Sequence, residues 1–267
     1  MLFNRLSELR AAARDQAAPL LEELTRHGYQ PIYGCVVGSH AYGTQTEDSD
    51  LDVRLVVLRP AEYVLSGRDE ESFRDHSSDT VAYTMDKFVR MLANGNPNIV
   101  DMVGIDDSMV FLIRPEFAYI KKNLHLLASK RIGSAYLGYA KSAMHRTNGS
   151  MATSDPKELK KRCKDLMHVY RATEAGAHIL RTGEVRANVS SPEVLRSIRN
   201  GEYILPDLGW PTMDFRTIFT MAVEALEEAH KQSTLPPWVP QGTISGIISY
   251  VNGFNMKRYM EDRTYEL

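Results

Sequence analysis

The segment GSHAYGTQTEDSDLDVRLVVL, residues Gly38 to Leu58, decides the fold that we expect for this chain. A Gly-Ser pair stands shortly before Asp50 and Asp52, and the two aspartates open an otherwise apolar run. Side chains alternate between the two faces of a strand, so both aspartates point one way. The opposite face carries Leu51, Val53, Leu55 and Val57. The pattern predicts a strand over residues 50–58 that carries two carboxylates on one face and a buried apolar face behind them.

Two carboxylates held this close together repel each other unless a cation lies between them. Carboxylate oxygens bind hard divalent cations, and Mg²⁺ often completes its octahedron with phosphate oxygens. Two such ions, about 3.5–4 Å apart, activate an attacking hydroxyl and stabilise a leaving pyrophosphate. Gly38 lets a ligand approach the backbone, and Ser39 offers an N–H and a hydroxyl at what looks like a helix start. The segment therefore favours a site for a triphosphate and its metal ions.

The Asp-x-Asp motif and the Gly-Ser motif each have an ordinary structural interpretation when they are considered alone. An isolated Asp-x-Asp is usually a solvated strand end, and an isolated Gly-Ser is a weaker signal still. Glu47 and Asp48 lie in the loop just before the aspartates, and we interpret them as solvated. Both motifs together, between two apolar strands, favour the functional reading.

Composition and charge exclude several classes of protein. The 267 residues are 43% apolar and 25% charged, as in an ordinary globular protein, and the formal net charge is −2. Any anion-binding surface must therefore be a local patch. The two cysteines, Cys35 and Cys163, exclude a disulfide scaffold and a cysteine-based zinc site. With no signal-like or membrane-spanning stretch, we expect a cytoplasmic protein that does not enter a membrane.

The hydrophobic pattern predicts a mixed α/β half followed by a helical half, with a boundary between residues 124 and 133. An opening helix is expected over residues 2–24, broken or restarted at Pro19. The other elements expected in the first half are strands at 31–37 and 79–85 and a helix at 87–93. In the second half, Asp155 caps a helix over 156–181, and a further helix covers 215–232.

The stretch GSHAYGTQTEDSDLDVR resembles the polymerase-beta-like nucleotidyltransferase superfamily, whose signature is Gly-Ser, a short spacer and Ser-Asp-x-Asp on a strand. More narrowly, the chain is similar to predicted nucleotidyltransferases associated with bacterial and phage RNA-repair ligases. The similarity continues through DTVAYTMDKFVRMLANGNPNIVDMV, CKDLMHVYRATEAGAHILRTGEV and residues 198–202. It covers most of residues 34–252.

This resemblance implies an α+β fold, in which a small mixed β-sheet with flanking helices precedes a mainly helical C-terminal region. Residues 1–125 would form the nucleotidyltransferase catalytic domain, and residues 126–267 would complete a cleft for nucleotide and acceptor. It also implies two Mg²⁺ ions, with Mn²⁺ as an alternative, and transfer of an NMP from ATP or another NTP with loss of pyrophosphate. Carried over by position, Gly38 and Ser39 bind the triphosphate, and Asp50 and Asp52 bind metal.

The superfamily normally adds a third acidic residue on a neighbouring strand, which orients or deprotonates the acceptor hydroxyl. Asp79 is the candidate for this catalytic and metal-binding role, because it begins the predicted strand DTVAYTM. Asp86 is the alternative, although its place beside Lys87 at a helix start favours a capping role. The sequence does not decide between Asp79 and Asp86.

Basic residues on the helix over 156–181 form the second candidate region. Lys164, His168 and Arg171 follow each other at i, i+4 and i+7. With the family resemblance, this spacing predicts that they bind nucleotide phosphates or the acceptor, and a solvated charged face is the alternative. Arg54, next to the aspartates, either meets phosphate or offsets their negative charge. The Asn96-Pro97 turn is interpreted as structural, with Asn96 or Asn98 as a cap.

An RNA 3′ end is the acceptor that the resemblance favours, with an RNA ligase as a functional associate. The net charge of −2 weighs against this, because proteins that bind free RNA usually carry a basic surface. A second interpretation is transfer of the NMP to a hydroxyl of a protein or small molecule. A third is a non-catalytic nucleotide- or RNA-binding partner of a ligase. The choice of NTP, any template and the number of subunits stay open.

Overall fold

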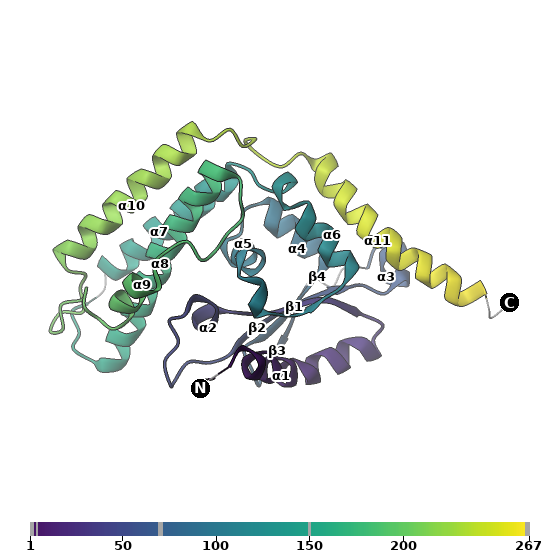
Figure 1. The fold of residues 1–267 in the computed structure, drawn as a ribbon, viewed down its shortest axis with the longest axis horizontal. Helices are drawn as coiled ribbons and strands as arrows, with labels where there is room; N and C mark the ends of the chain where they lie inside the picture. The colour runs from purple at the N-terminus through teal and green to yellow at the C-terminus, as the bar shows by residue number, and fades with distance from the viewer. Residues whose placement is uncertain (1–2, 4, 69–71, 149–150, 265–267) are drawn as a thin grey trace. The chain divides into compact units, whose positions relative to one another are not determined.

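The computed structural model describes residue 3 and residues 5–68, 72–148 and 151–264, which form two compact units (Figure 1). Unit 1 comprises Met1–Ala93, Ile105–Leu127 and Val239–Leu267, and unit 2 comprises Asn94–Gly104 and Ala128–Trp238. The predicted boundary at residue 125 lies close to Leu127. The division into residues 1–125 and 126–267 nevertheless differs from the structure, because each unit is built from separate stretches of the chain.

A five-stranded mixed sheet in the order β3-β4-β2-β1-β5 forms the centre of unit 1. β2 pairs antiparallel with β1 and parallel with β4, and β5 and β3 add antiparallel edges. This confirms the expected small mixed sheet, with β3 and β5 as two strands that the sequence pattern did not predict. The strands are β1 (Gln30–Val37), β2 (Asp52–Leu58), β3 (Ser72–Asp75), β4 (Thr80–Thr84) and β5 (Val110–Ile113).

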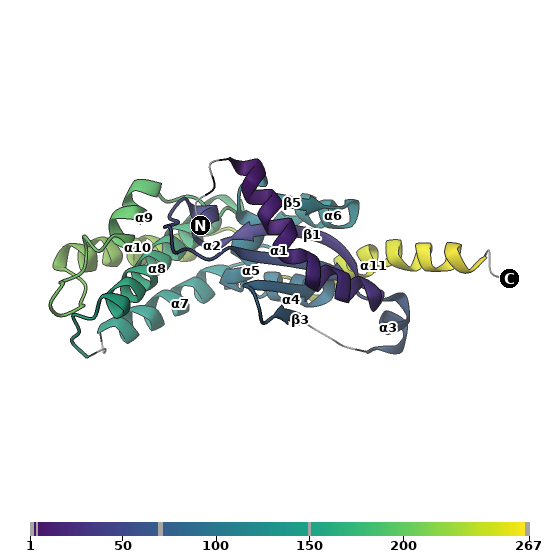
Figure 2. The ribbon, with the colours of Figure 1, turned by 90° about the horizontal axis from the view of Figure 1, so that it is seen from below.

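The first helix, α1 (Leu6–Arg26), covers one face of this sheet (Figure 2). Ala13 and Ala17 have no exposed surface, and their small side chains let the helix lie close to the strands. The prediction of a break at Pro19 was wrong. Pro19 is exposed, and buried residues on both sides of it pack against the sheet, so the helix continues through the proline. Its buried residues are Leu9, Ala13, Ala17, Leu20 and Leu24.

Helices α4 (Met85–Ala93) and α6 (Pro115–Lys122) cover the opposite face of the sheet (Figure 1). Tyr33 of β1 stacks on Phe117 of α6 with ring centroids 3.8 Å apart. Short helices complete the connections of this unit. They are α2 (Gly38–Tyr42), α3 (Ala61–Ser66), η1 (Asp107–Met109) and η2 (Leu124–Leu126).

The C-terminal helix α11 (Gln241–Thr264) belongs to unit 1 rather than to the helical region in which the sequence pattern had placed it. Asn255 donates a 2.7 Å hydrogen bond to the carbonyl of Arg59, and Asn252 donates to Asp86 at 3.3 Å. Arg258 forms an ion pair with Glu116 of α6. These polar contacts fix the helix to segments far away in the sequence, which a local pattern does not reveal.

Unit 2 is helical, as expected for this part of the chain. Its largest core lies among α7, α8, α9 and α10 and includes Leu166, Met167 and Phe215. Asp155 caps α8 as predicted, and its carboxylate accepts a 3.2 Å bond from the N–H of Lys157. The helices are α5 (Pro97–Gly104), α7 (Arg131–Asn148), α8 (Pro156–Thr182), α9 (Pro192–Arg199) and α10 (Met213–Gln232).

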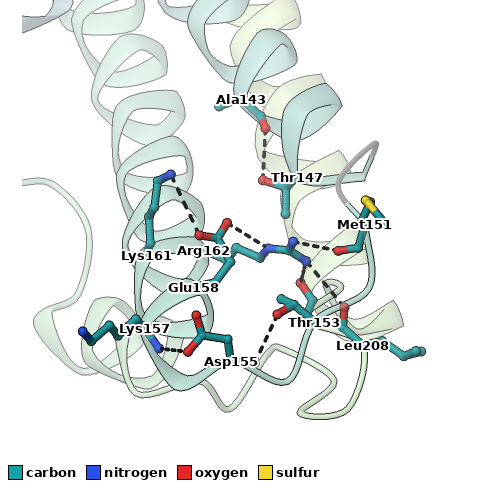
Figure 3. A network of polar contacts seen from close by, with 11 residues as sticks. Ala143, Thr147, Met151, Thr153, Asp155, Lys157, Glu158, Lys161, Arg162 and Leu208 are labelled. Carbon is teal, nitrogen blue, oxygen red and sulfur yellow. Dashed lines mark hydrogen bonds and ion pairs between the residues drawn. The ribbon is translucent and has the colours of Figure 1, made fainter.

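A buried arginine ties two loops of unit 2 to α8 (Figure 3). The guanidinium of Arg162 donates to the carbonyl of Gly209 at 3.0 Å and to that of Met151 at 2.8 Å. Its Nε lies 3.6 Å from a carboxylate oxygen of Glu158. The side chain of Arg162 is therefore engaged inside the unit, although the sequence places it in a row of basic residues.

No helix among the described residues combines the length and the apolar character needed to cross a bilayer.

Candidate active site

The Gly-Ser pair lies directly beside the first carboxylate of β2. β1 ends at Val37, which pairs with Asp52, and α2 begins at Gly38 as a single helical turn. Gly38 has φ +69°, and a Cβ at this position would lie 2.9 Å from Cγ of Asp52. Only glycine fits both the backbone conformation and the space. The predicted helix start at the Gly-Ser pair is confirmed, and Ser39 is buried within the turn.

The two aspartates differ in their surroundings. β2 begins at Asp52 and not at Asp50, so the predicted strand started two residues too early. Asp50 is exposed in the loop, and the side chain of Asp52 is 27% exposed. The alternation argument therefore applies to Asp52 and Arg54, which share a strand face, whereas Asp50 lies on irregular backbone before the strand.

Arg54 connects the two acidic strand starts. Its guanidinium lies 3.4 Å from a carboxylate oxygen of Asp52 and donates a 2.8 Å bond to the carbonyl of Asp79. The prediction that Arg54 offsets the local negative charge fits this arrangement. The side chain also fixes the backbone that carries the proposed third carboxylate.

Asp79 stands next to Asp52 across the parallel pair of strands. Val53 pairs with Thr80, and the N–H of Val53 donates a 3.0 Å bond to the carbonyl of Asp79. Parallel strands begin at the same edge of a sheet, so the residue before β4 lies at the edge where β2 begins. Asp79 is exposed at this edge.

Asp86 lies at the other end of the same strand. β4 ends at Thr84, and at ~3.3 Å per residue this places Asp86 about 20 Å from Asp79. Asp86 is buried in an ion pair with Arg59, which follows the far end of β2. The geometry therefore places Asp79, and not Asp86, beside the first two aspartates.

The donor set at this edge fits a divalent cation that is shared with substrate. No group of three or more His, Cys, Asp or Glu side chains in the described part of the chain is gathered closely enough to hold a metal by itself. Mg²⁺ usually takes one or two carboxylates and completes its shell with waters and substrate phosphates. Asp50 and Asp52 carry such oxygens, and the missing Cβ of Gly38 lets the carboxylate of Asp52 lie against the Gly-Ser turn.

The three basic candidates of α8 do not share one exposed face. Lys164 is exposed, His168 is partly buried, and Arg171 is buried. The guanidinium of Arg171 forms an ion pair with Asp101 of α5, which also accepts a 3.2 Å bond from the hydroxyl of Tyr136. This differs from the predicted row of phosphate-binding side chains, because the charge of Arg171 is compensated inside unit 2.

His168 lies in a positively charged environment. Burial, and to a smaller extent the charges of Arg171, Lys164 and Arg199, lower its pKa from 6.5 to about 3. Arg199 lies on α9, and only the fold brings it near His168 of α8. Lys164 is the exposed cation among the three predicted residues, because Asp101 compensates the buried charge of Arg171.

This environment predicts that acid destabilises the protein through His168. The native state keeps the imidazole neutral, whereas the unfolded chain binds a proton below pH 6.5, so stability falls as the pH drops below that value. We expect a loss of about 1–2 kcal/mol between pH 6.5 and 5 from this group. Urea unfolding at several pH values measures it. His168→Gln should make the free energy of unfolding depend less on pH between 6.5 and 5. An equal pH dependence in the variant and the wild type would contradict the prediction.

Residues 13–207 match the family described as RNA repair pathway DNA polymerase beta family. The chain belongs to this family. The match confirms the expected polymerase-beta-like nucleotidyltransferase family, and it includes both the Gly-Ser motif of unit 1 and α8 of unit 2.

Two individual proteins are also similar to this family member. An uncharacterised 38.9 kDa protein from the nrdC-mobD intergenic region of Enterobacteria phage T4 is 26% identical over an alignment of 117 residues that covers 39% of this chain. The chain spans 34% of the length of that relative. The crystal structure of a nucleotidyltransferase-like protein from Exiguobacterium sibiricum aligns over 84% of this chain and 74% of its own. Its 14% identity and TM-score of 0.29 are too low to support an argument.

Proposed function

We propose that this member of the RNA repair pathway DNA polymerase beta family is a metal-dependent nucleotidyltransferase. It would move an NMP from an NTP to an acceptor hydroxyl and release pyrophosphate. The observation that carries this proposal is that Gly38, Asp52 and Asp79 meet at one edge of the sheet, although they come from three separate elements.

Each side chain at this edge would have a separate role in such a transfer. Asp50 and Asp52 would hold the divalent ions, Mg²⁺ or Mn²⁺, which supply Lewis-acid chemistry when they are bound. The backbone at Gly38 and Ser39 would contact the triphosphate. Asp79 would accept the proton of the attacking hydroxyl, since it is exposed beside Asp52.

Arg54 and Lys164 have supporting roles in this proposal. Arg54 would keep the two strand starts in place through its contacts with Asp52 and Asp79. Lys164 is exposed and near other cations, so it would contact a phosphate of the nucleotide or the acceptor. Arg171 would add positive charge near Lys164 from inside unit 2, whereas His168 stays neutral and would act only as a hydrogen-bonding group.

An RNA 3′ end is the acceptor that we propose, with an RNA ligase as a functional associate. The family description names an RNA repair pathway, which supports this choice. The exposed Lys164 supports it as well, because local basic side chains can bind a phosphate backbone when the net charge of the chain is −2.

The decisive experiment offers the protein each α-labelled NTP in turn with Mg²⁺ or Mn²⁺. Two RNAs of the same sequence serve as acceptors, one ending in a free 3′ hydroxyl and one in a 3′ phosphate. We expect label on the first RNA only, because a phosphate at the 3′ end removes the nucleophile. Label on added protein or on a small molecule would overturn the RNA acceptor. No transfer with any NTP would overturn the enzyme and leave a non-catalytic nucleotide- or RNA-binding partner.

A further inference from the structure

A glutamine of α1 bridges the two strand starts that carry the proposed carboxylates. The side chain of Gln16 is partly buried between the helix and the sheet. Its Nε2 donates a 2.7 Å hydrogen bond to the carbonyl of Leu51 and a 3.2 Å bond to Oγ1 of Thr80. A primary amide carries two N–H donors, so both bonds can form at the same time.

Each partner of Gln16 is a direct neighbour of a proposed catalytic residue. Leu51 lies between Asp50 and Asp52, and Thr80 follows Asp79. Leu51 precedes β2, so the regular pairing of the strands does not include it. The bond from Gln16 fixes this carbonyl where the backbone is otherwise irregular.

The bridge continues into the turn that leads to Asp79. The hydroxyl of Ser78 donates a 2.9 Å bond to Oγ1 of Thr80 and lies 2.8 Å from a carboxylate oxygen of Asp75. Thr80 itself has no exposed surface. Gln16 is therefore one end of a chain of hydrogen bonds that reaches both sides of Asp79.

We infer that Gln16 is a positioning residue for the carboxylate site, an inference that rests on the proposed function. It acts through the Leu51 carbonyl and the Thr80 hydroxyl, and it approaches from the sheet face opposite to the carboxylates. Arg54 holds the same two strand starts from the carboxylate side. Together, the two side chains set the spacing between Asp52 and Asp79.

Gln16→Met tests this inference, because methionine keeps the length and helix propensity of the side chain and loses both donors. Arg14→Met is the matched control. Arg14 lies on the same helix and donates a 3.2 Å bond to the carbonyl of Phe111 in β5, a strand that pairs with β1 and with neither β2 nor β4. Both variants thus lose contacts between α1 and the sheet, but only one loses contacts beside the site.

The readout is binding of Mn²⁺ alone, measured by electron paramagnetic resonance without nucleotide, together with urea unfolding. We expect Gln16→Met to weaken Mn²⁺ binding about three- to ten-fold, and Arg14→Met to bind as the wild type does. Thr80→Val should weaken binding in the wild type and add little in the Gln16→Met background, since both changes break the same bridge.

The possible outcomes distinguish the positioning role of Gln16 from the proposed metal site itself. Equal Mn²⁺ binding by Gln16→Met and Arg14→Met, with binding lost in Asp52→Asn, would overturn the positioning role and leave the metal site intact. A wild type that binds no Mn²⁺, or an Asp52→Asn variant that binds as much as the wild type, would overturn the metal site and the positioning role together.

Discussion

Replacing both Asp50 and Asp52 with Asn is expected to lower NMP transfer by about 100-fold or more. Asparagine keeps the size of each side chain but removes the two negative charges that would bind the divalent ions. Asp50 is exposed and Asp52 is partly exposed, so the substitutions should leave the free energy of unfolding within about 1 kcal/mol of the wild type. Labelled NMP transfer and urea unfolding measure the two quantities.

Glu23→Gln is the control for this pair, because Glu23 is an exposed carboxylate of α1 in the same unit. Its transfer rate should equal that of the wild type. Transfer by the double variant at the wild-type rate would contradict the assignment of the metal-binding carboxylates. Loss of transfer together with loss of folding would assign the two aspartates a structural role instead.

Arg171→Met is expected to destabilise the protein by about 3–5 kcal/mol, because it leaves the carboxylate of Asp101 buried without its cation. Both side chains are buried, and Tyr136 also donates to Asp101, so the network joins α5, α7 and α8. Urea unfolding measures the loss. The sequence pattern groups Arg171 with Lys164 and His168 on one helix face, and it gives no sign that the loss of Arg171 would cost this much stability.

Two further variants show whether the effect comes from the buried pair. Lys164→Met removes an exposed cation of the same helix and should change stability by no more than about 0.5 kcal/mol. Adding Asp101→Leu to Arg171→Met should recover much of the loss, since no unpaired charge is then left buried. If Arg171→Met were as stable as Lys164→Met and bound nucleotide less well, Arg171 would be a ligand-binding residue and the structural role would be wrong.

Much of unit 1 could be predicted from local patterns. The apolar runs at 31–37, 50–58 and 79–85 correspond to β1, β2 and β4, and the helix after β4 was also expected. These strands are central or next to central in the sheet, so both of their faces are covered and their sequences are strongly apolar. β3 and β5 are edge strands of four residues each, and their weaker patterns did not distinguish them from loops.

Only part of the candidate site could be predicted from the sequence. The motif indicates Gly38, Ser39, Asp50 and Asp52 by their spacing along one segment. Gln16 gives no such signal, because a glutamine at the partly buried edge of an amphipathic helix looks like any solvated residue. Its role depends on hydrogen bonds to partners 35 and 64 residues away along the chain.

The sequence by itself determined that a Gly-Ser turn and a pair of aspartates flank neighbouring strands, because strand periodicity and turn chemistry are local properties. Only the tertiary structure placed Asp79 beside Asp52, paired Asp86 with Arg59 at the other end of β4, and turned Arg171 inward to Asp101. It alone also joined α11 to the sheet-containing unit. The physical reason is that strand direction, burial and the compensation of charge depend on residues far apart in the chain, which meet only when it folds.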